Sequence, residues 1–471
     1  MRLNDKIKEG NFLLETEGIV SSVKTDFSQG NVACTVISKM PIQAISKIMV
    51  EPYDRVELEE GDTGFAVKRV LGKATVQVYR VRLARALKSF GFAKKINASA
   101  DLKPIKGIIP SMEEALNTFA KTLIGGAPIV VHFHNDCDGA SGGIALYRAV
   151  VNKQESFGLP SDRISWQISN SIAYSKEAFL SDLLLFNIYK CTEKPLVLVT
   201  DFGTTEESVE AIEQAADKVN LIWIDHHPIP EDFPYKKIMH YINPWLFGGD
   251  SNTTAGMLTC VFAELLSGID VDELKQASLI ADHSTYANPN DDKAHKLAIV
   301  LDALTIGGEA KHGKLTPRYM DRVIKSEKEF DEILRTASAQ LAEALEQGVK
   351  RAKHYKGRDG IGVHVLNYEY VSDLYLEYVK LGRYASRLHD KFEEFGGEKS
   401  VTIVYTNRFM TIRVSKGIAS SVRILKAIED IKANSGCIES GGGHNEAAGL
   451  KIKEGYTSTV IKLLLRELGV P

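Results

Sequence analysis

The stretch that decides the fold is Leu221-Ile222-Trp223-Ile224-Asp225-His226-His227, an apolar run that ends in an acid and two histidines. Four successive apolar residues predict a buried strand. Neighbouring side chains on a strand point to opposite faces, so both imidazoles can serve one site only if the strand ends there and the chain turns. The following Pro228 favours this, because proline restricts the residue before it to extended or turn conformations.

Three further acidic clusters occupy comparable positions. Two of them follow apolar runs: Pro128-Ile129-Val130-Val131 precedes His134-Asn135-Asp136-Cys137-Asp138-Gly139, and Leu196-Val197-Leu198-Val199 precedes Asp201. The third cluster is Asp282-His283. The carboxyl ends of parallel strands form one edge of a sheet, where ligands bind. A single acid at a strand end is more often a helix cap, but four such clusters in one chain predict a metal site.

Carboxylates and imidazoles together suit hard or borderline divalent cations such as Mn²⁺ or Mg²⁺, whereas thiolate-rich sites favour zinc. A two-metal hydrolytic site needs a bridging carboxylate and several terminal ligands, with the ions about 3.5–4 Å apart. His227 either ligates a metal or binds a phosphate oxygen just outside the cluster. Cys137 is expected to point away from the metals, between its two acidic neighbours. The candidate ligands are His134, Asp136, Asp138, Asp201, His226 and Asp282.

Length and composition describe an ordinary globular protein. The chain has 471 residues, 44% of them hydrophobic and 25% charged, with a net charge of −3. At about 150 residues per domain, roughly three domains are expected. The five cysteines are scattered without CxxC spacing, which favours a reducing compartment over a disulfide framework. We find no apolar run of about 18 residues and no signal-peptide pattern at the N-terminus, so we expect a cytoplasmic protein that does not enter a membrane.

Positive charge is concentrated between Val67 and Gly107, where Asp101 is the only acid. Such a stretch is a candidate surface for the backbone of a nucleic acid, although a charge run is often only a solvated face. The alternation Thr75–Arg82 predicts a half-exposed strand with outward basic residues. The basic residues are Lys68, Arg69, Lys73, Arg80, Arg82, Arg85, Lys88, Lys94, Lys95, Lys103 and Lys106.

The elements predict an α/β protein in four parts. Residues 1–106 contain about five short strands with turn signals and are predicted to form a small OB-like β-barrel. In residues 107–316, strands alternate with helices, which indicates a mostly parallel sheet covered on both faces. Residues 317–356 are predicted to form one long connector helix. Residues 357–471 form a second, smaller α/β domain.

A second motif lies near the end of the chain, in Gly441-Gly442-Gly443-His444-Asn445-Glu446-Ala447-Ala448-Gly449. Three glycines allow close approach of a ligand to backbone N–H groups, and His444 adds a donor for an anion. Alone, such a run is more often a flexible turn. Arg413 lies upstream in the same domain and is a candidate phosphate or base contact, although a surface arginine is the default.

Together these motifs resemble the DHH phosphodiesterase superfamily, in its DHHA1 branch. The resemblance rests on His134 to Gly139, on Asp201, on Asp225-His226-His227, on Asp282 and on the GGGHxxAAG motif at Gly441 to Gly449. It implies a catalytic DHH domain at 107–316 and a substrate-binding DHHA1 domain at 357–471. His134 departs from the aspartate that bacterial RecJ-type enzymes usually carry, which makes the site one charge less negative.

The resemblance also implies residue roles. The metal ligands would be His134, Asp136, Asp138, Asp201, His226 and Asp282, with Mn²⁺ or Mg²⁺ as the two cofactors. Asp225 would orient a neighbouring histidine. His227 would serve the scissile phosphate. The substrate strand would be held by Arg413, Gly441, Gly442, Gly443 and His444.

Length, the strand-rich N-terminal part and the connector resemble the archaeal RecJ-like exonucleases. The leading hypothesis is a single-strand-specific exonuclease on DNA or RNA, in which a metal-activated water attacks the phosphodiester. The alternatives are a phosphodiesterase for short oligonucleotides or cyclic dinucleotides and a catalytically inactive scaffold; an inorganic pyrophosphatase would lack the GGGH motif. A replication or RNA-processing protein partner is expected only by family analogy.

Overall fold

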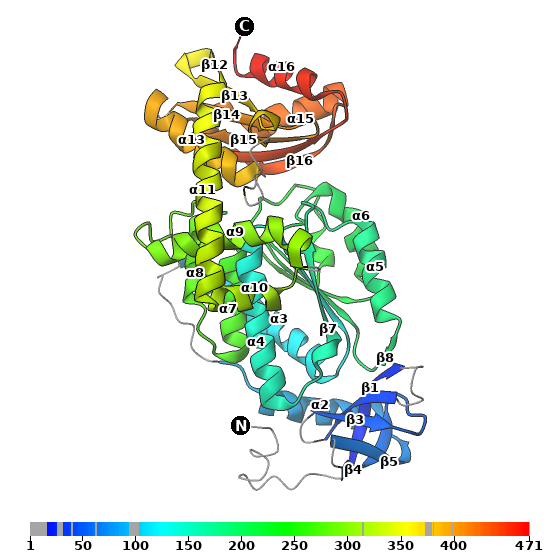
Figure 1. Ribbon diagram of the computed structural model, residues 1–471. Coiled ribbons are helices and arrows are strands. Elements are labelled where there is room, and N and C mark those ends of the chain that lie inside the picture. The colour runs from blue at the N-terminus through cyan, green and yellow to red at the C-terminus, as the bar shows by residue number, and fades with distance from the viewer. Residues whose placement is uncertain are drawn as a thin grey trace. The chain divides into compact units, whose positions relative to one another are not determined.

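The structure is a computed structural model that describes residues 17–25, 32–38, 41–61, 64–93, 103–312, 315–372, 379, 381–397 and 399–470 (Figure 1). Two compact units are present. The first comprises Met1–His295 and Thr316–Asp321, and the second comprises Lys296–Leu315 and Arg322–Pro471. The four-part division expected from the sequence stays a prediction. Among the described residues, no helix is long and apolar enough to cross a membrane.

The predicted small β-barrel is confirmed as a closed barrel of five strands. The pairing runs β1-β2-β3-β5-β4 and returns to β1, with β3 and β5 parallel and the other neighbours antiparallel. Alternate residues such as Val20, Val36 and Val56 fill the interior. The strands are β1 (Glu17–Thr25), β2 (Val32–Ile37), β3 (Pro41–Ser46), β4 (Asp54–Gly61) and β5 (Gly64–Lys73).

The predicted strand at Thr75–Arg82 is wrong, because these residues begin helix α2 (Val76–Phe90). Thr75 caps the helix by accepting a hydrogen bond from the Val78 N–H at 3.3 Å. The buried positions follow the helical period rather than the alternation: Tyr79, Leu83, Ala86 and Phe90. Lys94 and Lys95 of the basic stretch lie outside the described residues.

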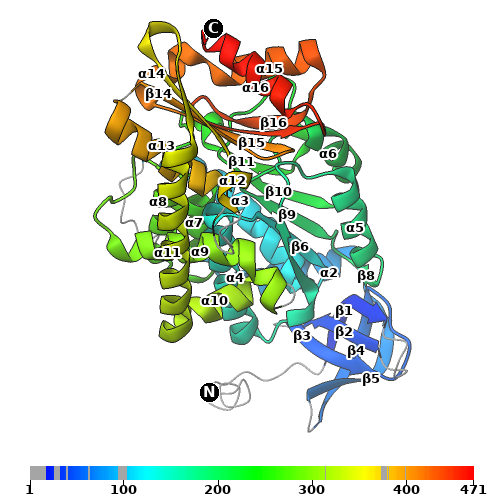
Figure 2. The same cartoon turned by 45° about the horizontal axis from the view of Figure 1, so that its top comes forward.

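A five-stranded parallel sheet forms the centre of the first unit, in the order β11-β10-β9-β6-β7. Helices cover both faces, as predicted for this region (Figures 1 and 2). Phe179 of α5 and Ile212 of α6 pack with Val199 and Trp223 on one face. On the other face, Thr259 of α7 hydrogen-bonds Thr200.

The elements of this region are, in chain order, α3 (Lys103–Ile124), β6 (Ile129–His134), α4 (Cys137–Phe157), η1 (Ser161–Arg163), β7 (Ile164–Ser169), α5 (Lys176–Phe186), β8 (Tyr189–Cys191), β9 (Leu196–Thr200), η2 (Glu206–Ser208), α6 (Val209–Ala215), β10 (Asn220–Ile224), η3 (Tyr235–Lys237), β11 (His240–Ile242), η4 (Pro244–Phe247), α7 (Ala255–Ser267), α8 (Asp272–Ala281) and α9 (Asp292–His312). Strand β8 does not join the parallel sheet but pairs with β1 of the barrel. The barrel therefore contacts the end of the sheet at which the parallel strands begin. Gly126, three residues before β6, also packs on Ser22 and Thr35 of the barrel.

The predicted single connector helix is divided into two helices, α10 (Pro317–Lys325) and α11 (Glu327–Arg351). Ser326 has extended backbone angles, and its hydroxyl accepts a hydrogen bond from the Glu329 N–H. A serine followed three residues later by glutamate is the capping-box pattern, which starts a new helix. The break between α10 and α11 therefore comes from a local capping pattern within a sequence that otherwise predicts a continuous helix.

The second unit contains a six-stranded mixed sheet in the order β12-β13-β14-β15-β17-β16. Only β13 and β14 are parallel neighbours. Its elements are β12 (Lys353–Lys356), η5 (Arg358–Gly360), β13 (Gly362–Asn367), α12 (Glu369–Ser372), α13 (Leu381–Gly396), β14 (Ser400–Tyr405), β15 (Phe409–Val414), α14 (Lys416–Val422), α15 (Ile424–Ser435), β16 (Ile438–His444), β17 (Ala447–Ile452) and α16 (Thr457–Glu467).

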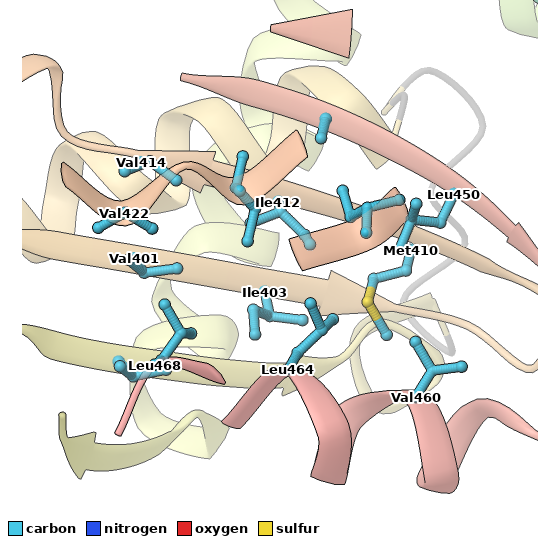
Figure 3. Close-up of a cluster of buried hydrophobic side chains, with 14 of the residues drawn as sticks. Val401, Ile403, Met410, Ile412, Val414, Val422, Leu450, Val460, Leu464 and Leu468 are labelled. Carbon is cyan, nitrogen blue, oxygen red and sulfur yellow. The ribbon is translucent and has the colours of Figure 1, made fainter. Parts of the chain in front are cut away.

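Helix α16 covers one face of this sheet. Figure 3 shows Val460 and Leu464 of the helix, and Leu468 directly after it, facing strand residues such as Ile403 and Met410. Spacings of four residues place these three side chains on one stripe. This cluster is one of the buried hydrophobic cores of the second unit.

We predict that Leu464→Ala destabilises the second unit by about 2–5 kcal/mol, because a fully buried leucine leaves a cavity. Hydrogen exchange of the β14 amides would measure the loss. Lys462→Ala, an exposed change on the same helix, should alter the protection by less than about 0.5 kcal/mol. Equal protection in the wild type and Leu464→Ala would contradict the assignment of this core.

Candidate metal centre

The predicted site residues of the first unit converge where three neighbouring parallel strands end. Strands β6, β9 and β10 lie side by side in register. His134 is the last residue of β6, Asp201 follows β9, and Asp225 follows β10. Because parallel strands end at the same edge of a sheet, three distant parts of the sequence deliver their side chains to one place.

The first group of candidate ligands consists of His134, Asp136 and Asp201, whose ligand atoms lie within 4.8 Å of one another. His134 Nδ1 lies 2.5 Å from Asp136 Oδ2 and 3.7 Å from Asp201 Oδ2. The other oxygen of Asp136 accepts the Gly139 N–H at 3.1 Å and caps helix α4. Asp136 thus uses one oxygen as a helix cap and directs the second into the cluster.

Gly139 is required by this turn. A Cβ atom at Gly139 would lie 2.5 Å from the carbonyl oxygen of His134 and 2.6 Å from its nitrogen. Any larger residue would push α4 away from the end of β6. The neighbouring Cys137 is buried, and its thiol contacts the Ala277 carbonyl, so it points away from the cluster as the sequence predicts.

The second group consists of Asp138, His226 and Asp282, which also lie within 4.8 Å of one another. Nε2 of His226 lies 3.4 Å from Asp282 Oδ2 and 3.9 Å from Asp138 Oδ2. Asp138 comes from the first turn of α4, and Asp282 directly follows α8 as its C-cap. The six predicted ligands therefore divide into two sets of three.

Asp201 lies between the two sets. Its Oδ2 faces His134 at 3.7 Å, and its Oδ1 faces His226 at 3.5 Å. The backbone holds the residue in the left-handed region at φ 68°, a conformation that aspartate adopts more readily than most residues. One carboxylate that presents an oxygen to each set has the geometry of a bridging ligand.

The electrostatics of Asp201 favour a cation. Burial, together with the neighbouring Asp136 and Asp138 carboxylates, raises the pKa of Asp201 well above its usual value. Among the described residues, the buried Oδ2 atoms of Asp201 and Asp138 have no hydrogen-bond partner. Oxygen and imidazole donors with buried, unsatisfied carboxylate oxygens fit divalent cations such as Mn²⁺ or Mg²⁺.

His226 is held in one orientation. Its Nδ1 lies 3.0 Å from the Ser251 carbonyl, which can only accept, so Nδ1 carries the hydrogen. The Nε2 lone pair is then directed at the carboxylates when the ring is neutral. Burial lowers the pKa of His226, but Asp282, Asp138 and Asp225 outweigh this effect and raise it overall.

Asp225 is fully buried and does not face the cluster with a free oxygen. Its Oδ1 accepts the Nδ1–H of His227 at 2.7 Å and the His226 N–H at 2.8 Å. Its Oδ2 accepts the Thr204 hydroxyl at 2.5 Å and the Thr204 N–H at 3.3 Å. Asp225 therefore holds both histidines in place, and the orienting role that the resemblance implies for it stays a prediction.

The sequence analysis did not identify several residues that support the ligands. The N–H of Gly256, in the first turn of α7, donates to Asp138 Oδ1 at 3.0 Å, and Ser278 donates to the same oxygen. A Cβ atom at Gly256 would lie 2.2 Å from the Asp138 carbonyl oxygen. The pattern Thr254-Ala255-Gly256 is a helix-start signal, but its meaning depends on a contact 118 residues away.

In the second unit, Gly441, Gly442 and Gly443 lie in edge strand β16, not in a flexible turn, and His444 ends this strand. Ala447 opens the partner strand β17. Gly443 has φ 127°, and a Cβ there would lie 2.2 Å from the Ala447 carbonyl oxygen. Arg413 of β15 donates to Ser386 Oγ and the Gly382 carbonyl, so it ties β15 to α13. Substrate binding by these residues stays a prediction.

We predict that Asp201→Asn stabilises the metal-free protein by about 1–2 kcal/mol at pH 7. The folded-state pKa of Asp201 lies above its unfolded value of about 3.9, so its charge opposes folding at neutral pH. Asparagine tolerates the same positive φ. Thermal unfolding with a chelator measures the stability of the metal-free protein, and thermal unfolding with Mn²⁺ measures the stabilisation by the metal. The added Mn²⁺ should stabilise the wild type and the surface control Asp217→Asn but not Asp201→Asn; an equal Mn²⁺ effect in all three contradicts the assignment.

We predict that Asp225→Asn lowers the free energy of unfolding by about 1–3 kcal/mol at pH 7, because the new amide would face the Thr204 donors. Burial raises the pKa of Asp225, but its bonds with His227 outweigh this and hold it well below the usual range. The stabilisation is therefore present above about pH 3.9 and is lost as the pH falls through the folded-state pKa. In urea unfolding, the difference in free energy of unfolding between the wild type and Asp225→Asn should become smaller below pH 4. A difference that does not change with pH would refute this reasoning.

The comparisons with known proteins agree with this geometry. Residues 128–294 match the family model of the DHH family, N-terminal domain. An uncharacterized protein of Methanocaldococcus jannaschii is 31% identical over 227 residues, a match that spans 45% of this chain and 29% of that relative.

Two solved structures complete the comparison. A DHH-domain structure, described as a member of a family of ribosomal proteins, covers 83% of this chain and 97% of its own, with a TM-score of 0.70 at 20% identity. The exonuclease RecJ bound to manganese covers 77% and 95%, with a TM-score of 0.47 at 16% identity. The first of these shows a shared fold. Residues 128–294 are therefore a DHH-family domain, and the chain shares its fold with a DHH-domain structure.

Proposed function

We propose that this protein is a metal-dependent phosphodiesterase that acts as a single-strand-specific exonuclease on DNA or RNA. The observation that carries the proposal is the pair of three-residue ligand sets joined by Asp201. Two cations, Mn²⁺ first and Mg²⁺ second, would be held by His134, Asp136 and Asp201 and by Asp138, His226 and Asp282, with Asp201 shared. When bound, such a pair lowers the pKa of a water molecule and neutralises the charge of the phosphate.

The chain's own residues have separate tasks in this proposal. Asp201 and Asp138 each present a buried oxygen that no hydrogen-bond donor among the described residues occupies, so both oxygens are available to a cation. Asp225 fixes the ring of His227 through Nδ1, which leaves Nε2 on the side away from Asp225. The His227 side chain is 33% exposed, so Nε2 can donate to a phosphate oxygen when it is protonated.

In the second unit, Gly441, Gly442, Gly443, His444 and Arg413 are the proposed contacts for the substrate strand. The open space beside Gly442 and Gly449 fits this role, because a Cβ atom at either residue would meet nothing within 4 Å. We also propose a cytoplasmic location, in keeping with five free cysteines. A replication or RNA-processing protein partner remains part of the proposal by family analogy alone.

The test is digestion of end-labelled single-stranded DNA and RNA of about 20 nucleotides with Mn²⁺. Stepwise shortening is expected, and the position of the label gives the polarity. Asp136→Ala and His226→Ala should reduce the rate by at least about 100-fold, since each removes one ligand of a different set. Asp217→Asn, an exposed carboxylate on the same unit, should retain the wild-type rate.

Two outcomes would change the assignment. Intact 20-mers combined with rapid loss of dinucleotides or cyclic dinucleotides would identify a short-oligonucleotide phosphodiesterase. No hydrolysis of either class of substrate would favour a non-catalytic scaffold.

A further inference from the structure

Helix α2 carries positive charge without any acidic residue along its length. Arg80, Arg85 and Lys88 are exposed, and Arg82 is half-buried. The side chains of Arg85 and Lys88 form no ion pair with any residue that the structure describes. A polyanion could therefore bind Arg85 and Lys88 without first displacing an acid that the structure describes.

The basic residues of the barrel differ in this respect. Lys68 and Arg69 of β5 both pair with Glu57, at 3.2 Å and 2.5 Å. Lys73 pairs with Asp54 at 2.7 Å. Lys68, Arg69 and Lys73 of the barrel are thus paired with acids, whereas Arg85 and Lys88 of α2 pair with no acid among the described residues. Charge complementarity with a nucleic-acid backbone points to α2.

Helix α2 is anchored rigidly in the first unit. Tyr79, Leu83 and Phe90 bury its inner face. At its C-terminal end, the buried Lys153 donates to the carbonyls of Phe90 and Gly91 at 2.7 and 2.8 Å. Lys153 belongs to α4, the helix whose first turn supplies Asp138 to the metal centre. One helix therefore connects α2 with the ligand cluster.

The length of α4 sets the separation. From Cys137 to Phe157 the helix has 21 residues, which corresponds to about 31 Å at 1.5 Å per residue. A strand stacked as in a duplex rises about 3.4 Å per nucleotide. In this stacked form about nine nucleotides are needed to extend from the metal centre to α2, and a stacked oligonucleotide of five is too short to contact both.

We propose that α2 is a second nucleic-acid contact surface, which binds the backbone of substrates longer than about nine nucleotides at a distance from the metal centre. The proposal rests on the proposed function and names the substrates for which that function is most efficient. The exposed arginine and lysine side chains contact phosphates, so the contact is independent of base sequence. Binding through α2 lowers the KM for long strands and leaves the chemistry at the centre unchanged.

The test compares two charge-matched double variants of the full chain. Arg85→Gln/Lys88→Gln removes two unpaired charges from α2, and Lys68→Gln/Arg69→Gln removes two paired charges from β5. Fluorescence anisotropy without divalent metal measures the binding of labelled 30-nucleotide and 5-nucleotide strands, and a separate digestion with Mn²⁺ measures kcat and KM.

For the α2 variant we expect roughly ten-fold weaker binding of the 30-mer, and a slope of log affinity against log salt that is smaller by about 1.4. Its KM for the 30-mer should rise with kcat unchanged, and its binding and hydrolysis of the 5-mer should stay within about two-fold of the wild type. The β5 variant should resemble the wild type with both strands.

Three outcomes overturn the proposal: unchanged 30-mer binding by the α2 variant, an equal loss with the 5-mer, or an equal loss in the β5 variant. A different result is that the α2 variant binds the 30-mer more weakly but the wild type hydrolyses neither strand. This result would support α2 as a nucleic-acid surface and refute the proposed exonuclease activity. Circular dichroism of both variants shows whether either change disturbs folding.

Discussion

Like charges buried close together are the constraint on which the first unit depends. Asp136, Asp138, Asp201 and Asp282 surround two imidazoles, and Asp138 and Asp201 are almost fully buried. In a medium of low dielectric constant such carboxylates repel one another and lose hydration. A divalent cation relieves both penalties, so the arrangement is stable in its charged form only when positive charge is supplied.

The surrounding residues orient Asp138 and His226 but leave one polar atom of each directed at the cluster. Gly256 and Ser278 satisfy one oxygen of Asp138 and leave the other without a partner. The Ser251 carbonyl fixes the hydrogen of His226 on the far side of the ring. Close backbone contacts at Gly139 and Gly256 leave no room for a side chain at either position. Preorganisation of this kind holds a metal site ready, at the expense of the stability of the metal-free chain.

Helix α4 has a different task at each end. Its first turn brings Asp136 and Asp138 to the ends of the parallel strands, and its last turns hold α2 through Lys153. The barrel contacts the opposite end of the sheet from the ligands, through β8 and Gly126. The candidate ligands and the proposed contact with long strands therefore lie at opposite ends of one helix within the first unit.

The sequence by itself determined which side chains gather at the ends of the parallel strands, because an apolar strand that ends in Asp or His is a local pattern, as at Ile224-Asp225-His226. It also determined the parallel sheet and the presence of a small barrel. Only the tertiary structure decided how the six candidate ligands divide and that Asp201 lies between them, since those relations join strands far apart in the chain. The alternation at Val76 and Val78 led to the prediction of a strand. In the structure these two valines are exposed, and the buried side chains of Tyr79 and Leu83 follow the helical spacing instead. That spacing becomes decisive only when the helix has a surface to pack against, and a single sequence does not contain that surface.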